Sequence, residues 1–191
     1  MQGGFPMAGL FLLAVPVLVL LWAVCNYNAL VRLRQHCRES WSAIDTELKR
    51  RYDLIPNLVR TVKGYASHER ETLEAVVRAR EAAVASTGSP ASQAGDENAL
   101  IAALRRLLVV VEAYPDLKAS QHFLALQKEL ANTEDRIQAA RRFYNANVRD
   151  LNTRVEVFPS NLIAGLFRFG PEEFFQIEDA QVRVAPTVET A

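Results

Sequence analysis

An uncharged apolar run opens the chain. No charged side chain occurs from Phe5 to Cys25, and the first is Arg32. As a helix, these 21 residues span about 31 Å, which matches the hydrocarbon thickness of a bilayer. Pro16 would kink such a helix, which membrane helices tolerate. The pattern therefore predicts a transmembrane helix, marked by Phe5, Leu10, Pro16, Leu21, Trp22 and Cys25.

Three other interpretations of the run fit less well. A cleaved signal peptide requires a basic segment before a shorter apolar core, whereas residues 1–4 carry no charged side chain. A lipoprotein signal ending at Cys25 would need smaller residues where Trp22 and Val24 stand. A buried soluble helix of this length would exceed what a small bundle can cover. Because the nearest cations, Arg32, Arg34 and Arg38, follow the run, the positive-inside rule places the N-terminus outside and the rest in the cytoplasm.

Helical periodicity continues beyond the run. Apolar residues recur at intervals of three and four, which is typical of one face of an α-helix. The stripe consists of Leu30, Leu33, Cys37, Trp41, Ile44, Leu48, Tyr52 and Ile55. Asp45 with Lys49, and Glu47 with Arg51, have the i,i+4 spacing of surface ion pairs. The membrane helix and the first domain helix are therefore predicted to form one continuous rod.

Prolines and a polar segment divide the middle of the chain. We expect a second helix from about Leu54 to Ala85, and periodicity leaves a kink or a reversal open at Pro56. Residues 86–95 are small and polar, which predicts a loop. Asp96 is then an N-cap for a third helix that reaches Tyr114, and Pro115 either ends that helix or opens the next.

A seven-residue repeat predicts a long fourth helix. Its apolar members are Phe123, Leu130, Ile137, Tyr144, Leu151 and Phe158. Such a repeat favours packing along neighbouring helices at bundle-type angles. Pro159 stops the helix, and an irregular tail rich in Phe follows, which we expect to contact the bundle or the membrane surface. The predicted organisation is residues 1–27 as N-terminus and membrane helix, 28–158 as an all-α up-and-down four-helix bundle, and 159–191 as the tail.

Charge and composition exclude several functions. Lys plus Arg equals Asp plus Glu at 22 each, so the basic excess of a nucleic-acid binder is missing. Cys25 and Cys37 would lie about 18 Å apart on one helix, too far to form a disulfide. His68-Glu69 resembles the start of a zinc-protease motif, but Thr72 occupies the position of the second imidazole. We therefore predict no enzyme activity, metal site or cofactor.

One polar constellation has two interpretations. Charged and aromatic residues gather near the end of the first domain helix and along the fourth. They can form an ionic layer that ties helices together, or a docking surface, because Arg and Tyr are enriched at binding hot spots. The set is Arg50, Arg51, Asp53, Glu134, Asp135, Arg136, Arg141, Arg142, Tyr144 and Asn145.

Several segments, in order, resemble the LemA family. They are residues 26–31 (NYNALV), 41–45 (WSAID), 49–59 (KRRYDLIPNLV), 62–69 (VKGYASHE), 112–119 (EAYPDLKA), 133–137 (TEDRI), 140–145 (ARRFYN) and 158–164 (FPSNLIA). The resemblance implies a single-pass protein of the bacterial inner membrane with a cytoplasmic four-helix bundle. It also implies chain reversal at both Pro56 and Pro115, and it brings no established catalytic activity.

The predicted function is a membrane-anchored, non-enzymatic scaffold or adaptor that docks partner proteins or self-assembles. An accessory subunit of a membrane protease or other hydrolase is the first alternative, and a membrane-remodelling coat made of amphipathic helices is the second. The expected partners are the lipid bilayer, unidentified membrane or cytoplasmic proteins, and a second copy of the chain.

Overall fold

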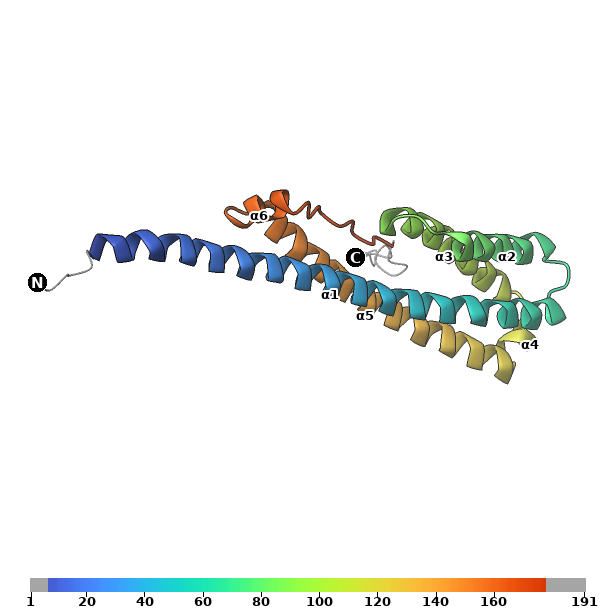
Figure 1. Cartoon of the computed structure of the whole chain (residues 1–191). Helices are drawn as coiled ribbons and strands as arrows, with labels where there is room; N and C mark the ends of the chain where they lie inside the picture. The colour runs from blue at the N-terminus through green and yellow to red at the C-terminus, as the bar shows by residue number, and fades with distance from the viewer. Residues whose placement is uncertain (1–6, 178–191) are drawn as a thin grey trace, which may run out of the picture. The chain divides into compact units, whose positions relative to one another are not determined.

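The computed structural model describes the backbone of residues 7–177 and the side chains of residues 14–177. Within this range the protein is all-α, as predicted, and contains no strand. The helices are α1 (Met7–Tyr65), α2 (Arg70–Ala85), α3 (Pro90–Val111), α4 (Pro115–Lys118), α5 (Gln121–Glu156) and α6 (Ser160–Leu166) (Figure 1). Phe5 and the end of the tail, residues 178–191, lie outside the described residues.

Helix α1 joins the apolar run to the first amphipathic stripe without a break. It comprises 59 residues and includes both Pro16 and Pro56. The prediction of one continuous helix is confirmed. The predicted reversal at Pro56, and with it a second helix that starts near Leu54, is wrong. The chain turns only at residues 66–69, after which α2 begins at Arg70.

A side chain from α2 explains why α1 continues through Pro56. Proline has no N–H, so the carbonyl of Tyr52, four residues earlier, loses its helical donor. Arg80 Nε donates to that carbonyl oxygen over 2.7 Å. The missing hydrogen bond is thus replaced by one from another helix, and the helix does not have to end there.

We expect Arg80 and Pro56 to be energetically coupled. Arg80→Ala should destabilise the protein by about 1 kcal/mol, because it leaves the Tyr52 carbonyl unpaired. In a Pro56→Ala background the loss should be smaller, because the N–H of alanine can bond to Tyr52. Thermal unfolding of the four variants in detergent measures the coupling. An identical loss in both backgrounds would show that Arg80 does not substitute for the proline.

The connection before α3 is shorter than predicted. Helix α3 begins at Pro90, and Ser89 is its N-cap, with a side-chain oxygen 3.5 Å from the Ser92 N–H. The predicted loop over residues 86–95 is therefore half helical, and Asp96 lies inside α3. Pro90 at the first helical position costs nothing, since that N–H is unpaired in any helix.

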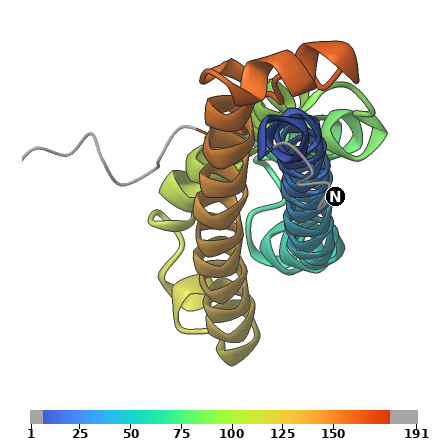
Figure 2. The ribbon, with the colours of Figure 1, turned by 60° about the vertical axis from the view of Figure 1, so that its left-hand side comes forward.

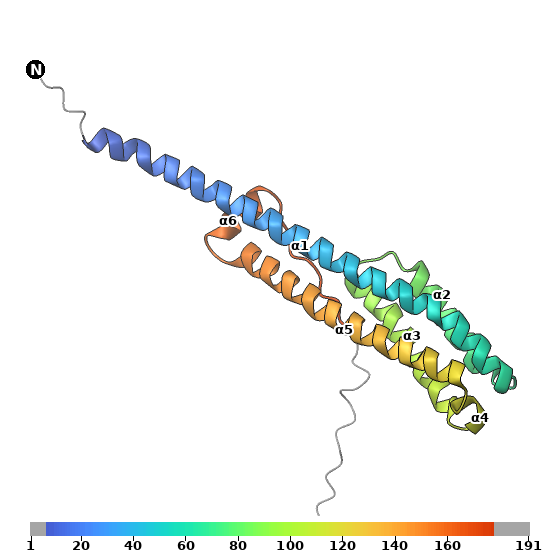
Figure 3. The same cartoon turned by 90° about the horizontal axis from the view of Figure 1, so that it is seen from below.

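The reversal near Pro115 occurs as the resemblance implied. Helix α3 ends at Val111, and Pro115 opens the four-residue α4 with Asp116 in its first turn. Helix α5 then starts at Gln121 and runs back beside the second half of α1 (Figure 3).

The described part of the chain forms two compact units. The predicted domain bounds, with one bundle over residues 28–158, stay a prediction. The first unit contains residues 7–40 and Tyr144–Glu172, and the second contains Trp41–Phe143 and residues 173–177. The second unit combines parts of α1 and α5 with α2, α3 and α4, and α2 packs on α3. Its core contains members of the predicted stripe and of the seven-residue repeat, together with residues of α2 and α3. The fully buried apolar side chains include Ile44, Ile55, Val62, Leu100, Leu107 and Ile137.

The first unit pairs the start of the amphipathic stretch of α1 with the end of α5. Arg154 donates to Asn26 Oδ1 over 2.6 Å, and Asn147 donates to Ser40 Oγ over 3.1 Å. Helix α6 crosses the end of α5 (Figure 2). Two predictions fail here. The tail is not wholly irregular, because it contains α6, and Phe158 follows the end of α5 with its side chain 74% exposed instead of extending the heptad seam.

Candidate functional site

The N-terminal part of α1 presents apolar side chains that the protein does not cover. Leu18 is 64% exposed and Leu20 is 65% exposed. Only 11% of the most apolar 18-residue stretch of the helix is buried, and the helix is long and apolar enough to cross a membrane. A core helix of a soluble domain would hide such residues. The segment is therefore consistent with a membrane anchor.

The second unit contains a buried layer of charge, which we call the Arg51 layer. It consists of Arg51 and Tyr52 from α1, Glu97 from α3 and Glu134 from α5. The side chains of Arg51 and Glu97 are each only 2% exposed, and they form a salt bridge through Nη2 and Oε2. Arg51 Nη1 lies 2.8 Å from Glu134 Oε2. One guanidinium therefore bridges carboxylates from two different helices, one through each terminal nitrogen, which the several N–H donors of arginine permit.

Tyr52 completes the layer as a permanent hydrogen-bond donor. Its hydroxyl donates to Glu97 Oε1, so both oxygens of the buried carboxylate have partners. Burial raises the pKa of Tyr52 far above its ordinary value, and the hydrogen bond to Glu97 raises it further. The phenol is therefore protonated at every physiological pH. A buried carboxylate with a cation and a neutral donor is satisfied, and this layer serves to connect α1, α3 and α5.

The structure separates the predicted polar constellation. Arg51 and Glu134 meet in the Arg51 layer. Arg50 pairs with Glu129 over 3.1 Å at the surface, and the exposed Arg136 lies 3.8 Å from the half-buried Glu47. The predicted Glu47–Arg51 pair is wrong, because Arg51 turns inward to Glu97.

The other members of the constellation are not among the four residues that define the Arg51 layer. Asp53, Asp135 and Arg142 are exposed. Arg141 donates to the Ile177 carbonyl, which fixes the tail to α5. Tyr144 is buried and Asn145 half-buried, and both belong to the first unit.

An apolar groove adjoins the Arg51 layer, and we call it the α3–α5 groove. It holds about 260 Å³ and is lined by apolar side chains of α1, α3 and α5 with a few polar groups. Its lining consists of Arg51, Leu58, Ile101, Leu104, Arg105, Leu108, Gln127, Leu130, Ala131 and Glu134. An apolar wall with a few polar side chains is typical of grooves that bind an amphipathic helix.

The two cysteines are candidate nucleophiles. Cys25 and Cys37 are free thiols, and Cys37 is buried whereas Cys25 is exposed. Burial, together with the nearby carboxylates of Glu172 and Asp150, raises the pKa of Cys37 to about 11. This thiol is therefore a poor nucleophile at neutral pH. Among the described side chains, no three or more His, Cys, Asp or Glu residues are grouped to hold a metal ion.

Fold and surfaces together define an all-α protein with an apolar N-terminal helix and a helical domain held by a buried charge layer. A model of the LemA family matches residues 40–189. The chain belongs to the LemA family.

Curated relatives carry two names. Magnetosome protein MamQ 2 of Paramagnetospirillum magneticum is 27% identical in an alignment 180 residues long that covers 81% of this chain and 66% of that protein. Protein LemA of Metamycoplasma hominis is 27% identical over 155 residues, covering 81% of this chain and 70% of that protein. Magnetosome protein MamQ of Magnetospirillum gryphiswaldense is 25% identical over 198 residues, covering 88% and 73%. The chain spans just under two thirds of the length of the first of these relatives.

Proposed function

We propose that this protein is a non-enzymatic scaffold or adaptor anchored in the bacterial inner membrane by α1. The observation that carries the proposal is the exposed apolar surface of α1 ahead of Asn26. Uncharged helical segments of this length partition into bilayers, and they are rarely left uncovered in water. The cations that follow, Arg32, Arg34 and Arg38, favour an external N-terminus and a cytoplasmic helical domain.

The α3–α5 groove is the proposed docking site for a partner. Its walls offer leucine and isoleucine side chains, and Leu108 is 37% exposed at its edge. Gln127 and Arg105 provide hydrogen-bond donors beside these apolar contacts. An amphipathic helix of another membrane-associated protein would bury its apolar side in the groove and bond to the polar groups with its edges. The ligand proposed for the groove is therefore a helical segment of another protein.

Two matched alanine substitutions on α5 test the docking site. Ala131 lines the groove and is exposed, whereas Ala139 is exposed on the same helix and does not line it. Ala131→Glu should remove crosslinks to the partner in native membranes, because it places a charge against the apolar side of the docked helix. Ala139→Glu should leave the crosslinks unchanged. Both variants should keep the thermal unfolding midpoint, because neither alanine is in the core.

The crosslinked products distinguish the outcomes. Adducts with another protein that disappear only in Ala131→Glu support the adaptor. Adducts between two copies of the chain that disappear in the same variant would show that the groove binds a second copy. That result would contradict docking of a different protein. A protein that forms no adduct in native membranes would contradict the scaffold as a whole.

A further inference from the structure

Five large apolar side chains lie exposed in one short stretch of the first unit, between the end of α5 and the turn after α6. They are Val157 (52% exposed), Phe158 (74%), Leu162 (60%), Leu166 (73%) and Phe167 (52%). We call these residues the α6 patch. Helix α6 is amphipathic, because Ile163 and Ala164 are buried on its other side. A concentration of apolar surface of this kind on a protein marks a binding site.

The α6 patch lies beside the end of the apolar run of α1. Arg154, three residues before the patch, donates to Asn26, the residue that directly follows Cys25. The ring of Phe167 lies 4.7 Å from the ring of Tyr27, with the ring planes tilted by 59°. Figure 1 shows α6 next to α1 at this level, with the start of α1 extending beyond it. The patch is therefore level with the membrane–water boundary that the anchor defines.

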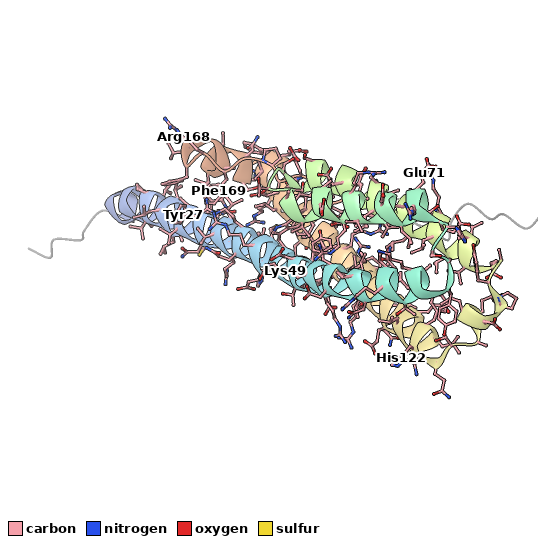
Figure 4. All side chains as sticks on the ribbon, turned by 90° about the vertical axis from the view of Figure 1, so that its right-hand side faces the viewer. Tyr27, Lys49, Glu71, His122, Arg168 and Phe169 are labelled. Atoms are coloured by element: carbon pink, nitrogen blue, oxygen red, sulfur yellow. The ribbon has the colours of Figure 1, made fainter. Side chains whose placement is uncertain are left out.

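The turn after α6 holds an arginine in a conformation that favours glycine. Arg168 has φ of 57°, and the N–H of Phe169 bonds to the Ala164 carbonyl over 2.9 Å. These are the features of a Schellman cap, in which glycine is the usual residue at this position. Phe169 is buried and lies 5.8 Å from Tyr27, ring to ring. Figure 4 shows Phe169 on the side of the turn that faces Tyr27, and Arg168 on its outer side.

We propose that the α6 patch is an interfacial membrane contact, with its apolar side chains among the outer acyl carbons and Arg168 at the lipid phosphates. This inference rests on the proposed anchoring by α1. Continuity with the anchor favours lipid over a second protein, because Asn26 contacts the end of α5 and Tyr27 contacts the turn after α6, at the point of α1 where a bilayer surface begins. Exposed leucines on one side of a short helix, flanked by phenylalanines and followed by an arginine, are the composition of an interfacial segment.

Depth measurements on the full chain test the inference. In a background with Cys25→Ser and Cys37→Ala, single cysteines are placed at Leu162, at Leu20 and at Ala146, and labelled with an environment-sensitive fluorophore. Leu20 reports the anchor. Ala146 is exposed on α5 next to Asn147, which contacts Ser40. Because Ser40 is about 22 Å along α1 beyond Cys25, the label at Ala146 reports a position outside the membrane. The protein is then incorporated into vesicles of mixed zwitterionic and anionic phospholipids.

The expected pattern assigns Leu162 to the membrane. A nitroxide on the lipid should quench labels at Leu162 and Leu20, and aqueous iodide should quench only the label at Ala146. Quenching of Leu162 by iodide, with Leu20 still quenched by lipid, would overturn the inference and leave the anchor intact. Protection of Leu162 from both quenchers would also overturn it, because protein would then cover the patch. A label at Leu20 that lipid does not quench would contradict the anchor itself.

Arg168→Gly provides a second measurement. Glycine adopts the positive φ freely, so the variant should keep or raise the thermal unfolding midpoint in detergent. If Arg168 binds lipid phosphate, the same variant should lose part of the lipid quenching at Leu162 in anionic vesicles. Unchanged quenching would remove Arg168 from the proposed contact.

Discussion

Arg51→Met is expected to lower the free energy of unfolding by about 3–5 kcal/mol, because it leaves a buried carboxylate without its cation. Glu97 is 2% exposed, and its remaining donor in the Arg51 layer would be the neutral hydroxyl of Tyr52. Glu134 is affected less, because it is 32% exposed and can be hydrated. A loss of this size is a large part of the stability of an ordinary domain.

The neighbouring residue provides the control. Arg50 pairs with Glu129, but the two side chains are 45% and 46% exposed, so Arg50→Met should cost less than about 1 kcal/mol. Adding Glu97→Met to Arg51→Met should recover much of the loss, because an apolar pair replaces an unpaired charge. Thermal unfolding in detergent measures all three variants. Equal losses of stability in Arg50→Met and Arg51→Met would show that water reaches the Arg51 layer.

Two charges in the middle of the apolar run should remove the protein from the membrane. An arginine at the centre of a membrane helix opposes insertion by about 2.5–3.5 kcal/mol, so Val15→Arg with Leu18→Arg opposes it by roughly 5–7 kcal/mol. Both side chains are exposed in the described structure, 59% and 64%, so the double variant should keep its helical fold. Membrane and soluble fractions of cells that produce each variant provide the measurement.

A matched double variant isolates the role of the anchor. Val84 and Val109 are also exposed apolar residues, at 51% and 73%, but they belong to α2 and α3 of the second unit. Val84→Arg with Val109→Arg should leave the protein in the membrane fraction. If Val15→Arg with Leu18→Arg stayed there too and resisted alkaline extraction, α1 would not be what holds the protein.

Periodicity predicted the packing surfaces of the helices but not where they end. The stripe from Leu30 to Ile55 is the buried side of α1, as predicted. Pro56 misled the prediction because the donor that replaces its N–H is the side chain of Arg80, which lies 28 residues away from Tyr52 in the sequence. At Phe158 the opposite error occurred. The seven-residue spacing continues, but α5 ends at Glu156, so the side chain lies at the surface.

The Arg51 layer was half visible in the sequence. The sequence points to Arg51 and Glu134 but not to Glu97, because a third helix that begins at Asp96 places Glu97 at a helix end. With α3 starting at Pro90, Glu97 lies three residues before Leu100 on the buried stripe. A charge on an apolar stripe is the signal that would have identified it, since such a charge needs a partner. The α3–α5 groove forms only when α1, α3 and α5 pack together, so no local sequence pattern predicts it.

Membrane crossing by α1 is tested most directly by comparing the accessibility of residues before and after its apolar run. With Cys25 and Cys37 replaced as above, single cysteines are placed at Gln2, before the apolar run, and at Glu39, which is 74% exposed after it. An impermeant maleimide is applied to intact spheroplasts. The proposed topology predicts labelling at position 2 before lysis, and at position 39 only after the membrane is opened. Equal labelling of the two positions in intact spheroplasts would contradict a membrane-spanning α1.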